Sequence, residues 1–257
     1  MTDATFTLQD AARLSLACLD LTSLNDADTP ADVEALCRRA QTRFGPVAAV
    51  CVWPRFAALA RSLLPAGIRV AAVANFPSGA LDLAGTLADV AQIRDAGAQE
   101  VDVVLPYRAL LAGQDAEVLA FLTAVRAACA GLTLKVIIES GELQSPAAIA
   151  KASALALRAG ADFIKTSTGK TAVSATPEAA RAMLQALADS GRADAGFKAS
   201  GGIRSVPDAK LYLALAAERW GLDALKPERF RFGASGLLND IEAVLAGQAS
   251  TAQGGGY

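Results

Sequence analysis

The feature that most constrains the fold is the alternation of short β-rich runs with longer helical patterns along the whole chain. Eight runs have the length and composition of buried strands, and amphipathic stretches separate them. The expected strands are residues 18–24, 47–53, 69–75, 100–106, 134–140, 163–169, 196–202 and 230–235. Eight β-then-α units in 257 residues predict an α/β protein with a single (β/α)8 TIM barrel.

One domain is expected to hold the whole barrel. We place it at residues 1–246, with an extra N-terminal helix at "LQDAARLSLA", and we expect residues 247–257 to form a flexible C-terminal tail. Three pairs of a cap residue and proline predict helix starts: Thr29-Pro30, Ser145-Pro146 and Thr176-Pro177. The alternative is an open doubly wound sheet, but its glycine-rich nucleotide fingerprint is absent from the sequence.

Charge and composition exclude several classes of partner. The formal net charge is −2 with acids and bases interspersed, so neither nucleic acid nor a membrane surface is expected to bind. No apolar run of about 18 residues and no signal peptide is evident, and the four cysteines form no metal-binding pattern. We therefore expect a cytoplasmic protein with free thiols. Because the chain has no histidine, a metal site is not expected, and proton transfer must use other side chains or water.

Polar residues occupy strand positions that should face the inside of the barrel. Strand side chains alternate between two faces, so parity shows which residues share a face. The opposite parity of these strands is almost purely apolar, as expected where a barrel meets its helices. The inward polar set is Asp20 and Thr22, Asp102, Lys135 and Glu139, Lys165 and Ser167, and Lys198 and Ser200.

Two interpretations of these charges are open. In the first, the acids and lysines neutralise one another in a structural salt-bridge network, although buried ion pairs seldom stabilise more than apolar residues would. In the second, a lysine is a nucleophile, which requires a neutral amine and hence a lowered pKa. Desolvation and a second ammonium group lower the pKa of an amine. Lys165 and Lys198, on neighbouring expected strands, supply such a pair, and Schiff-base chemistry fits the sequence best.

Glycine-rich turns follow the last three expected strands. They read "STGK" (167–170), "SGGIR" (200–204) and "GASG" (233–236). Turns of this kind expose backbone N–H groups at the carboxyl face of a barrel, where phosphate groups are commonly bound. The segment "GKT" (169–171) does not make a P-loop, because Gly160 lies too far upstream for the required spacing.

Nearly the whole chain resembles the deoxyribose-phosphate aldolases, which are class I, Schiff-base aldolases. The motifs that carry the resemblance are "LDLTSLN", "EVDVVLPYRAL", "LKVIIESGEL", "GADFIKTSTGK", "GFKASGGIR", "RFGASGLL" and the final tyrosine. The resemblance implies reversible cleavage of 2-deoxy-D-ribose 5-phosphate to glyceraldehyde 3-phosphate and acetaldehyde, with no cofactor and no metal. It also implies a homodimer.

The resemblance implies a role for each matching residue. Lys165 resembles the Schiff-base lysine, Lys198 the lysine that perturbs it, and Asp102 the carboxylate that relays protons. Asp20 resembles the acid that positions Lys198, and Tyr257 the tail residue that helps to move a proton. The remaining positions resemble substrate-binding residues: Thr22, Cys51, Gly169, Lys170, Gly201, Gly202, Gly233, Ser235 and Gly236.

One position departs from the family pattern. Close relatives can carry two serines in the turn after the eighth strand, whereas Gly236 occupies the second position here. This change removes one hydroxyl from the phosphate turn and leaves the backbone N–H. Two alternative functions are a transaldolase-like or other class I aldolase acting on a phosphosugar, and a non-catalytic phosphosugar-binding barrel.

Overall fold

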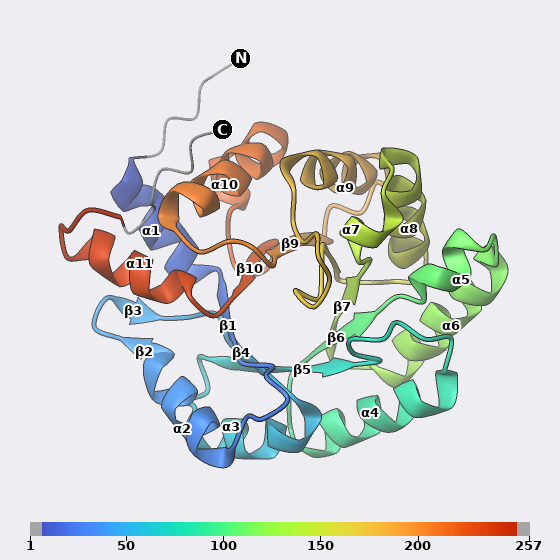
Figure 1. The fold of residues 1–257 in the computed structure, drawn as a ribbon, viewed down its shortest axis with the longest axis horizontal. Coiled ribbons are helices and arrows are strands. Elements are labelled where there is room, and N and C mark those ends of the chain that lie inside the picture. The colour runs from blue at the N-terminus through green and yellow to red at the C-terminus, as the bar shows by residue number, and fades with distance from the viewer. Residues whose placement is uncertain (1–6, 251–257) are drawn as a thin grey trace.

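A computed structural model describes residues 7–250, which form a closed barrel of eight parallel strands surrounded by helices (Figure 1). The strands follow one another round the barrel in chain order, and the last pairs with the first to close it. They are β1 (Leu19–Thr22), β4 (Ala49–Val52), β5 (Arg69–Ala74), β6 (Glu100–Val104), β7 (Thr133–Ile137), β8 (Phe163–Lys165), β9 (Gly196–Ser200) and β10 (Phe230–Ala234). The prediction of a (β/α)8 barrel is confirmed.

Helices form the outer layer of the molecule (Figure 1). They are α1 (Leu8–Ala17), α2 (Pro30–Arg39), α3 (Ala57–Leu63), α4 (Leu83–Asp95), α5 (Tyr107–Leu111), α6 (Asp115–Ala128), α7 (Ser140–Leu143), α8 (Pro146–Arg158), α9 (Pro177–Asp189), α10 (Val206–Trp220) and α11 (Leu237–Leu245). Two 3-10 turns, η1 (Pro54–Phe56) and η2 (Leu222–Ala224), and a short hairpin of β2 (Gln41–Thr42) and β3 (Gly45–Pro46) complete the described elements. Across residues 7–250 no helix combines the length and the apolar character that crossing a membrane requires.

The predicted helix starts at cap residues are confirmed. Thr29, Ser145 and Thr176 each lie just before a helix that begins with proline, and each side chain accepts a hydrogen bond from the backbone N–H three residues later. Such a cap satisfies a donor that the helix leaves without a partner, and replacing it by alanine typically costs about 1 kcal/mol. The extra N-terminal helix is α1, which packs against α10 and α11.

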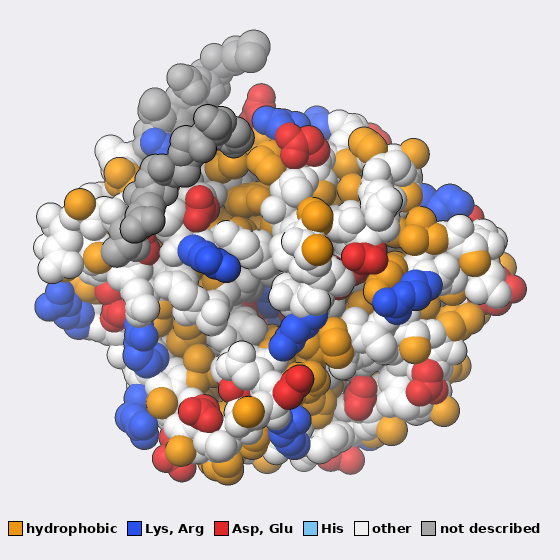
Figure 2. All heavy atoms as spheres, viewed as in Figure 1, with side chains coloured by type: hydrophobic (Ala, Val, Ile, Leu, Met, Phe, Trp, Pro, Cys, Tyr) orange, Lys and Arg blue, Asp and Glu red, His pale blue; other side chains and the backbone are white. Residues whose placement is uncertain are grey.

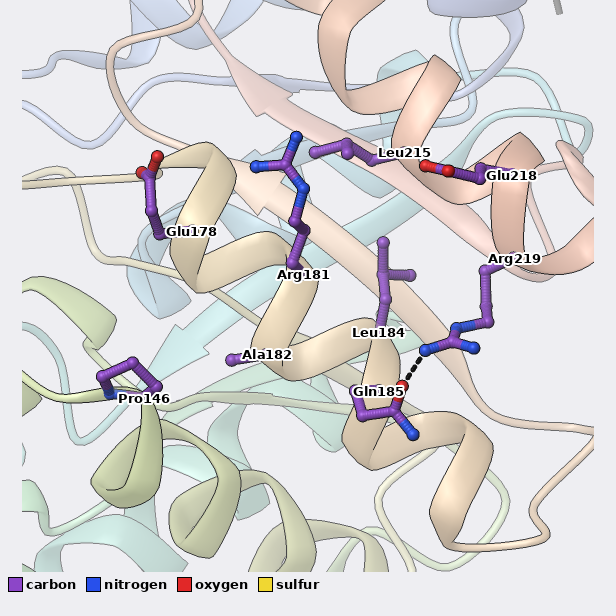
Figure 3. Close-up of a pocket in the computed structure, with 9 residues that line it drawn as sticks. All are labelled: Pro146, Glu178, Arg181, Ala182, Leu184, Gln185, Leu215, Glu218 and Arg219. Carbon is purple, nitrogen blue, oxygen red and sulfur yellow. Dashed lines mark hydrogen bonds between the residues drawn. The ribbon is translucent and has the colours of Figure 1, made fainter. Parts of the chain in front are cut away.

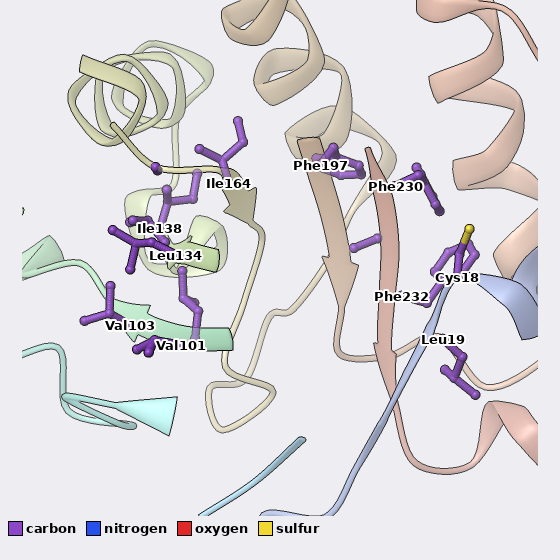
Figure 4. Close-up of a cluster of buried hydrophobic side chains, with 14 of the residues drawn as sticks. Cys18, Leu19, Val101, Val103, Leu134, Ile138, Ile164, Phe197, Phe230 and Phe232 are labelled. Carbon is purple, nitrogen blue, oxygen red and sulfur yellow. The ribbon is translucent and has the colours of Figure 1, made fainter. Parts of the chain in front are cut away.

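The hydrophobic core lies between the strands and the helices. The outward side chains of the strands are apolar and buried, and Figure 4 shows a group of them pointing away from the barrel interior. Three phenylalanines stack at this wall: the rings of Phe230 and Phe232 lie 4.8 Å apart edge to face, and that of Phe197 lies 6.0 Å from Phe230. Full burial of one such side chain contributes about 1.5–3 kcal/mol. The core is therefore outside the barrel, which leaves the inward positions available for polar groups.

Candidate active site

Lys165 and Lys198 lie side by side inside the barrel. Lys165 ends β8, Lys198 lies in β9, and the two are register partners in the pairing of these strands. Both side chains are buried, with relative exposures of 3% and 0%. Their ammonium groups meet at one oxygen, because Nζ of each lysine donates a hydrogen bond to Oδ2 of Asp102 at 2.8 Å. The pair that the sequence predicts is present, and its members share one carboxylate.

Asp20 of β1 binds Lys198 on another side. Its Oδ2 atom accepts a hydrogen bond from Lys198 Nζ, and it lies 3.3 Å from Nζ of Lys135. Lys135, in β7, also donates to Oδ1 of Asp102 at 2.9 Å. All of these side chains are buried. The inward placement predicted for Asp20, Asp102 and Lys135 is therefore correct.

Sequence reasoning missed two members of this network, Glu100 of β6 and Arg231 of β10. Arg231 donates from Nη2 to Oε1 of Glu100 at 2.9 Å and from Nη1 to Oδ1 of Asp20 at 2.5 Å. Lys135 Nζ also donates to Glu100. The signal was available: Glu100 has the same strand parity as Asp102, and Arg231 has the same parity as Gly233.

Glu139 does not belong to this network, and placing it in line with Lys135 was wrong. Strand β7 ends at Ile137, and Glu139 has a left-handed backbone with φ 52° just before α7. Its carboxylate accepts hydrogen bonds from the backbone N–H of Thr168 at 3.2 Å, from the Thr168 hydroxyl at 2.5 Å and from the Thr171 hydroxyl at 3.3 Å. Because the chain leaves the sheet earlier than expected, this acid holds the loop after β8. Ser167 likewise lies beyond the end of β8.

The three buried lysines differ in how many carboxylates they contact. Among the carboxylates of residues 7–250, Lys135 contacts Asp20, Glu100 and Asp102, and Lys198 contacts Asp20 and Asp102, whereas Lys165 contacts Asp102 alone. Each carboxylate favours the charged form of an amine beside it, and burial opposes that form. Lys165 is therefore the lysine whose positive charge is least stabilised.

The pKa directions follow from this difference. Burial lowers the pKa of Lys165, and the neighbouring charge of Lys198 lowers it further, against the opposing effect of Asp102. Burial also acts on Lys198, but the carboxylates of Asp102 and Asp20 outweigh it and raise the pKa of that lysine. In spite of burial, the lysines hold the pKa of Asp102 well below its usual range. The arrangement favours a neutral amine at Lys165 beside an ionised carboxylate.

A cavity of about 530 Å³ opens above Lys165 at the carboxyl ends of the strands. Figure 1 looks onto this end, and in Figure 2 lysine and arginine side chains lie near the centre of the same face. Eight residues singled out from the sequence line the cavity together with Lys165: Thr22, Gly169, Lys170, Gly201, Gly202, Gly233, Ser235 and Gly236. Ser23, Leu24, Asn25 and Arg204 also line it, and they were not among the predicted site residues.

The backbone of Gly233 makes room for Lys198. A Cβ atom at this position would lie 3.0 Å from Cε of Lys198 and 2.8 Å from Cβ of Ser200, both closer than ordinary contacts. Glycine in the interior of β10 therefore has a packing reason. Gly201 is constrained in a different way, because its φ of 82° and a Cβ position 2.5 Å from Oγ of Ser174 both disfavour a side chain. The turns after β9 and β10 thus bring their backbone close to the cavity.

Cys51 lies inside the barrel but does not line the mouth cavity. It is buried with Leu24, Ala71 and Val73 in a small apolar cluster against which Phe76 packs. Burial, with the nearby charge of Asp102, raises the pKa of the Cys51 thiol to about 11. The thiol is therefore neutral near pH 7. Tyr257, the remaining predicted site residue, lies outside residues 7–250.

Another hollow, of about 680 Å³, lies on the outer surface between α9 and α10 (Figure 3). Its lining includes Arg181, Leu215 and Arg219, and Arg219 donates a hydrogen bond to Gln185 within it. None of its nine lining residues belongs to a barrel strand. Lys165 and the glycine turns line the other cavity, and Lys165 connects it to Asp102, which in turn contacts Lys198. That cavity is therefore the candidate active site.

Comparison with known proteins gives a consistent result. Residues 14–241 match the model of the DeoC/LacD family of aldolases. The chain is 50% identical over 252 residues to the deoxyribose-phosphate aldolase of Agrobacterium fabrum, and the match covers 97% of each chain. The tetrameric deoxyribose phosphate aldolase of Aeropyrum pernix is similar in structure, with a TM-score of 0.72, 27% identity and 93% of each chain covered. A Toxoplasma gondii protein provisionally assigned the same activity has a TM-score of 0.85 and 25% identity, with 94% of this chain and 96% of that chain covered.

Proposed function

The chain belongs to the DeoC/LacD family of aldolases, and from this premise we propose that it cleaves 2-deoxy-D-ribose 5-phosphate through an imine on Lys165. The reaction gives glyceraldehyde 3-phosphate and acetaldehyde and runs in both directions. The observation that carries the assignment of Lys165 is its contact with a single carboxylate, because the other two buried lysines are held charged by two or three.

The covalent steps need only the groups around Lys165. The neutral amine attacks the C1 aldehyde of the open-chain sugar, and the carbinolamine loses water to give a protonated imine. This cation accepts the electron pair of the breaking C2–C3 bond, while the C3 hydroxyl loses its proton and leaves as the aldehyde of glyceraldehyde 3-phosphate. Protonation of the enamine at C2 and addition of water then release acetaldehyde and restore the amine.

Asp102 is placed to move the protons in these steps. One of its oxygens contacts both Lys165 and Lys198, so it can accept a proton near the nucleophile and return it, directly or through a water. Lys198 and Asp20 keep that oxygen and the charge around it in place. We assign proton transfer to Asp102, tuning of Lys165 to Lys198, and positioning of Lys198 to Asp20.

The sugar phosphate is assigned to the turns around the mouth cavity. The turn after β8 supplies Gly169 and Lys170, and the turn after β9 supplies Gly201 and Gly202. Ser235 and Gly236 precede α11, whose first backbone N–H groups and positive dipole end favour an anion. Lys170 and Arg204 are exposed cations at the same cavity. Backbone donors and two cations together suit a phosphate dianion.

Trapping of the imine tests this function. The protein is treated with acetaldehyde and sodium borohydride, and the modified peptide is located by mass spectrometry. We expect an ethyl adduct on Lys165, within "FIKTSTGK", and none in Lys165→Arg. Lys151→Arg, a change at a half-exposed surface lysine, should leave the adduct in place. An adduct confined to other lysines would overturn the assignment, and faster cleavage of a ketose phosphate would indicate a transaldolase-like enzyme.

We also propose a homodimer, as the resemblance implies, and a location in the cytoplasm. The tetrameric relative from Aeropyrum pernix supports self-association on this fold, and the four buried free cysteines suit a reducing compartment. Light scattering of the purified protein tests the first part: a mass of one chain would contradict it. For Tyr257 we propose the role that the resemblance implies, which is proton transfer at C2, the carbon that becomes the methyl group of acetaldehyde.

A further inference from the structure

A second set of charges lies below the lysine pair, toward the amino ends of the strands. It consists of Glu100, Lys135 and Arg231, whose side chains are 4% exposed or less. None of these three takes part in the covalent steps of the proposed reaction. They nevertheless connect to the catalytic groups, because Lys135 contacts Asp102 and Arg231 contacts Asp20.

The connected charges do not balance when all are ionised. Within residues 7–250, the contact network holds four buried cations, Lys135, Lys165, Lys198 and Arg231, and three buried carboxylates, Asp20, Glu100 and Asp102. Deprotonation of one amine makes the numbers equal. Lys165, at the end of the chain of contacts, has the fewest carboxylates to hold its proton.

Three other groups border this network. Arg69 contacts Oε1 of Glu100 at 3.0 Å, but its side chain is 48% exposed, so solvent screens its charge. Glu139 is held by Thr168 and Thr171 beyond the end of β7. The Cys51 thiol is neutral near pH 7 because its pKa is raised to about 11 by burial. A charge change within the network therefore shifts the ionisation of Lys165 in the same direction whether or not these three groups are counted.

We propose that Glu100 and Arg231 are positioning residues of the reaction, which act through Lys135 and Asp20 to determine how readily Lys165 loses its proton. Arg231 shares Asp20 and Glu100 with the two lysines that also hold Asp102, because Lys198 contacts Asp20 and Lys135 contacts Glu100. Glu100 in turn anchors Lys135. The inference rests on the proposed imine chemistry at Lys165.

Removing the Arg231 cation and removing the Glu100 carboxylate should have opposite effects on the proton of Lys165. Loss of the Arg231 cation makes the interior less positive and stabilises the ammonium of Lys165. Loss of the Glu100 carboxylate makes the interior more positive and favours the neutral amine. A unit charge about 10 Å away, at an effective permittivity of about 20, shifts such an equilibrium by about one pH unit.

The experiment measures the acid limb of kcat/KM against pH, which reports the ionisation of the free enzyme. We expect Arg231→Met to shift this limb to higher pH by about one pH unit. Glu100→Gln should shift it to lower pH by a similar amount. The double variant restores the net charge and should return the limb close to that of the parent. The rate of borohydride trapping with acetaldehyde, followed over the same pH range, should shift in the same way.

Two further variants separate tuning from folding. Arg231→Lys keeps the charge and should leave the limb nearly unmoved. Arg69 contacts the same Oε1 atom of Glu100 as Arg231 does, but its charge is screened by solvent. Arg69→Met should therefore shift the limb far less than Arg231→Met. If Arg231→Met does not fold, the limbs of Glu100→Gln and Arg231→Lys still decide whether charge in the network tunes Lys165. Folded variants whose limbs stay in place, or move together in one direction, would overturn the inference. Absence of an imine on Lys165 in the parent protein would instead overturn the proposed function.

Discussion

At the residue scale, three buried lysines inside one barrel differ in how strongly their positive charge is stabilised, because their neighbours differ. Lys135, Lys165 and Lys198 all contact Asp102, and within the described part of the chain Lys165 is the one without a second carboxylate. Burial opposes the charge of all three, so the number of anions in contact decides which of them is most easily neutral. The amine that loses its proton most easily is therefore set by its contacts rather than by its own burial.

Replacing Lys198 tests that selection at one residue. Lys198→Leu removes a like charge from Lys165 and a competitor for Oδ2 of Asp102, and both effects raise the pKa of Lys165. Because the nucleophile must be neutral, the acid limb of kcat/KM should move to higher pH. At a pH below the limb, activity falls about tenfold for every pH unit by which the limb moves up. We expect a loss at pH 7 of about 100-fold, with partial recovery at higher pH.

The control for this measurement is Lys151→Leu. It makes the same chemical change at a lysine that is 50% exposed and paired with Asp115 on the surface. Its pH profile should match that of the parent protein. If Lys198→Leu also keeps the parent profile and rate, Lys198 does not tune the nucleophile.

At the element scale, the loop between β8 and α9 depends on one acid from the preceding strand–helix unit. Glu139 binds Thr168 and Thr171, and the same turn brings Gly169 and Lys170 to the mouth cavity. Parallel neighbouring strands end at the same face of the barrel, so the loop after one can be held by the loop after the other. Glu139 therefore holds the turn that carries Gly169 and Lys170 without lining the cavity itself.

Glu139→Ala should affect phosphate binding more than chemistry. Loss of the acceptor for three donors loosens the turn, and a hydrogen bond to a charged group contributes about 1.5–3 kcal/mol. We expect KM for deoxyribose 5-phosphate to rise about tenfold, with kcat changed by less than about threefold and cleavage of unphosphorylated deoxyribose unchanged. Glu139→Gln keeps one acceptor, so its KM for deoxyribose 5-phosphate should lie between those of the parent protein and Glu139→Ala. An equal loss on both sugars would indicate general damage rather than a loosened turn.

The start of α11 gives a second prediction at this scale. Gly236 is its N-cap without a side-chain cap, and a Cβ atom there meets nothing within 4 Å. Gly236→Ser therefore adds a hydroxyl at the phosphate turn without crowding. KM for deoxyribose 5-phosphate should fall about threefold, as expected for a hydrogen bond of about 0.5–1.5 kcal/mol.

Unphosphorylated deoxyribose serves as the internal control for that variant. In the parent protein its kcat/KM should be lower than that of the phosphorylated sugar by at least about 100-fold, and Gly236→Ser should leave it unchanged. Equal efficiency on the two sugars would contradict a phosphate site at these turns.

At the scale of the whole molecule, the barrel keeps its apolar core and its charges in separate layers. The core lies outside the strands, and the charged groups lie inside them, where closure of the sheet leaves no unpaired edge. The chain also returns toward the catalytic end after its last helix. Ser250 donates a hydrogen bond to Oδ2 of Asp240 at 2.8 Å, in the first turn of α11, whose N-terminus follows the phosphate turn.

Deletion of Tyr257 tests whether the end of the chain contributes to the reaction. Seven residues follow Ser250, and a chain of that length can span at most about 25 Å. We expect the deletion to slow exchange of the acetaldehyde methyl protons with solvent at least about tenfold, measured by NMR in D2O. Melting temperature and borohydride trapping at Lys165 should stay as in the parent protein. Tyr257→Phe, which lacks only the hydroxyl, should reproduce the loss, and full exchange in both variants would exclude the phenol from proton transfer.

The barrel, the inward lysines and the glycine turns could all be predicted from the sequence alone. These follow from short-range rules: eight alternating patterns specify the units, strand parity assigns Asp20, Asp102, Lys165 and Lys198 to the interior, and proline after a cap residue starts a helix. The same parity would also have found Glu100 and Arg231. The rules failed at strand ends: β7 stops at Ile137, so Glu139 lies beyond the strand and binds the loop after β8, a contact that strand parity does not predict.

Which charges come into contact could not be predicted from the sequence and depends on the folded barrel. Asp102 and Lys165 are 63 positions apart and Asp20 and Arg231 are 211 apart, yet each pair is in hydrogen-bond contact. Strand order and register fix such contacts, and they depend on all eight strands closing together. Electrostatic energies change with distance and surroundings, so the difference between Lys165 and the two lysines beside it exists only once the barrel has closed.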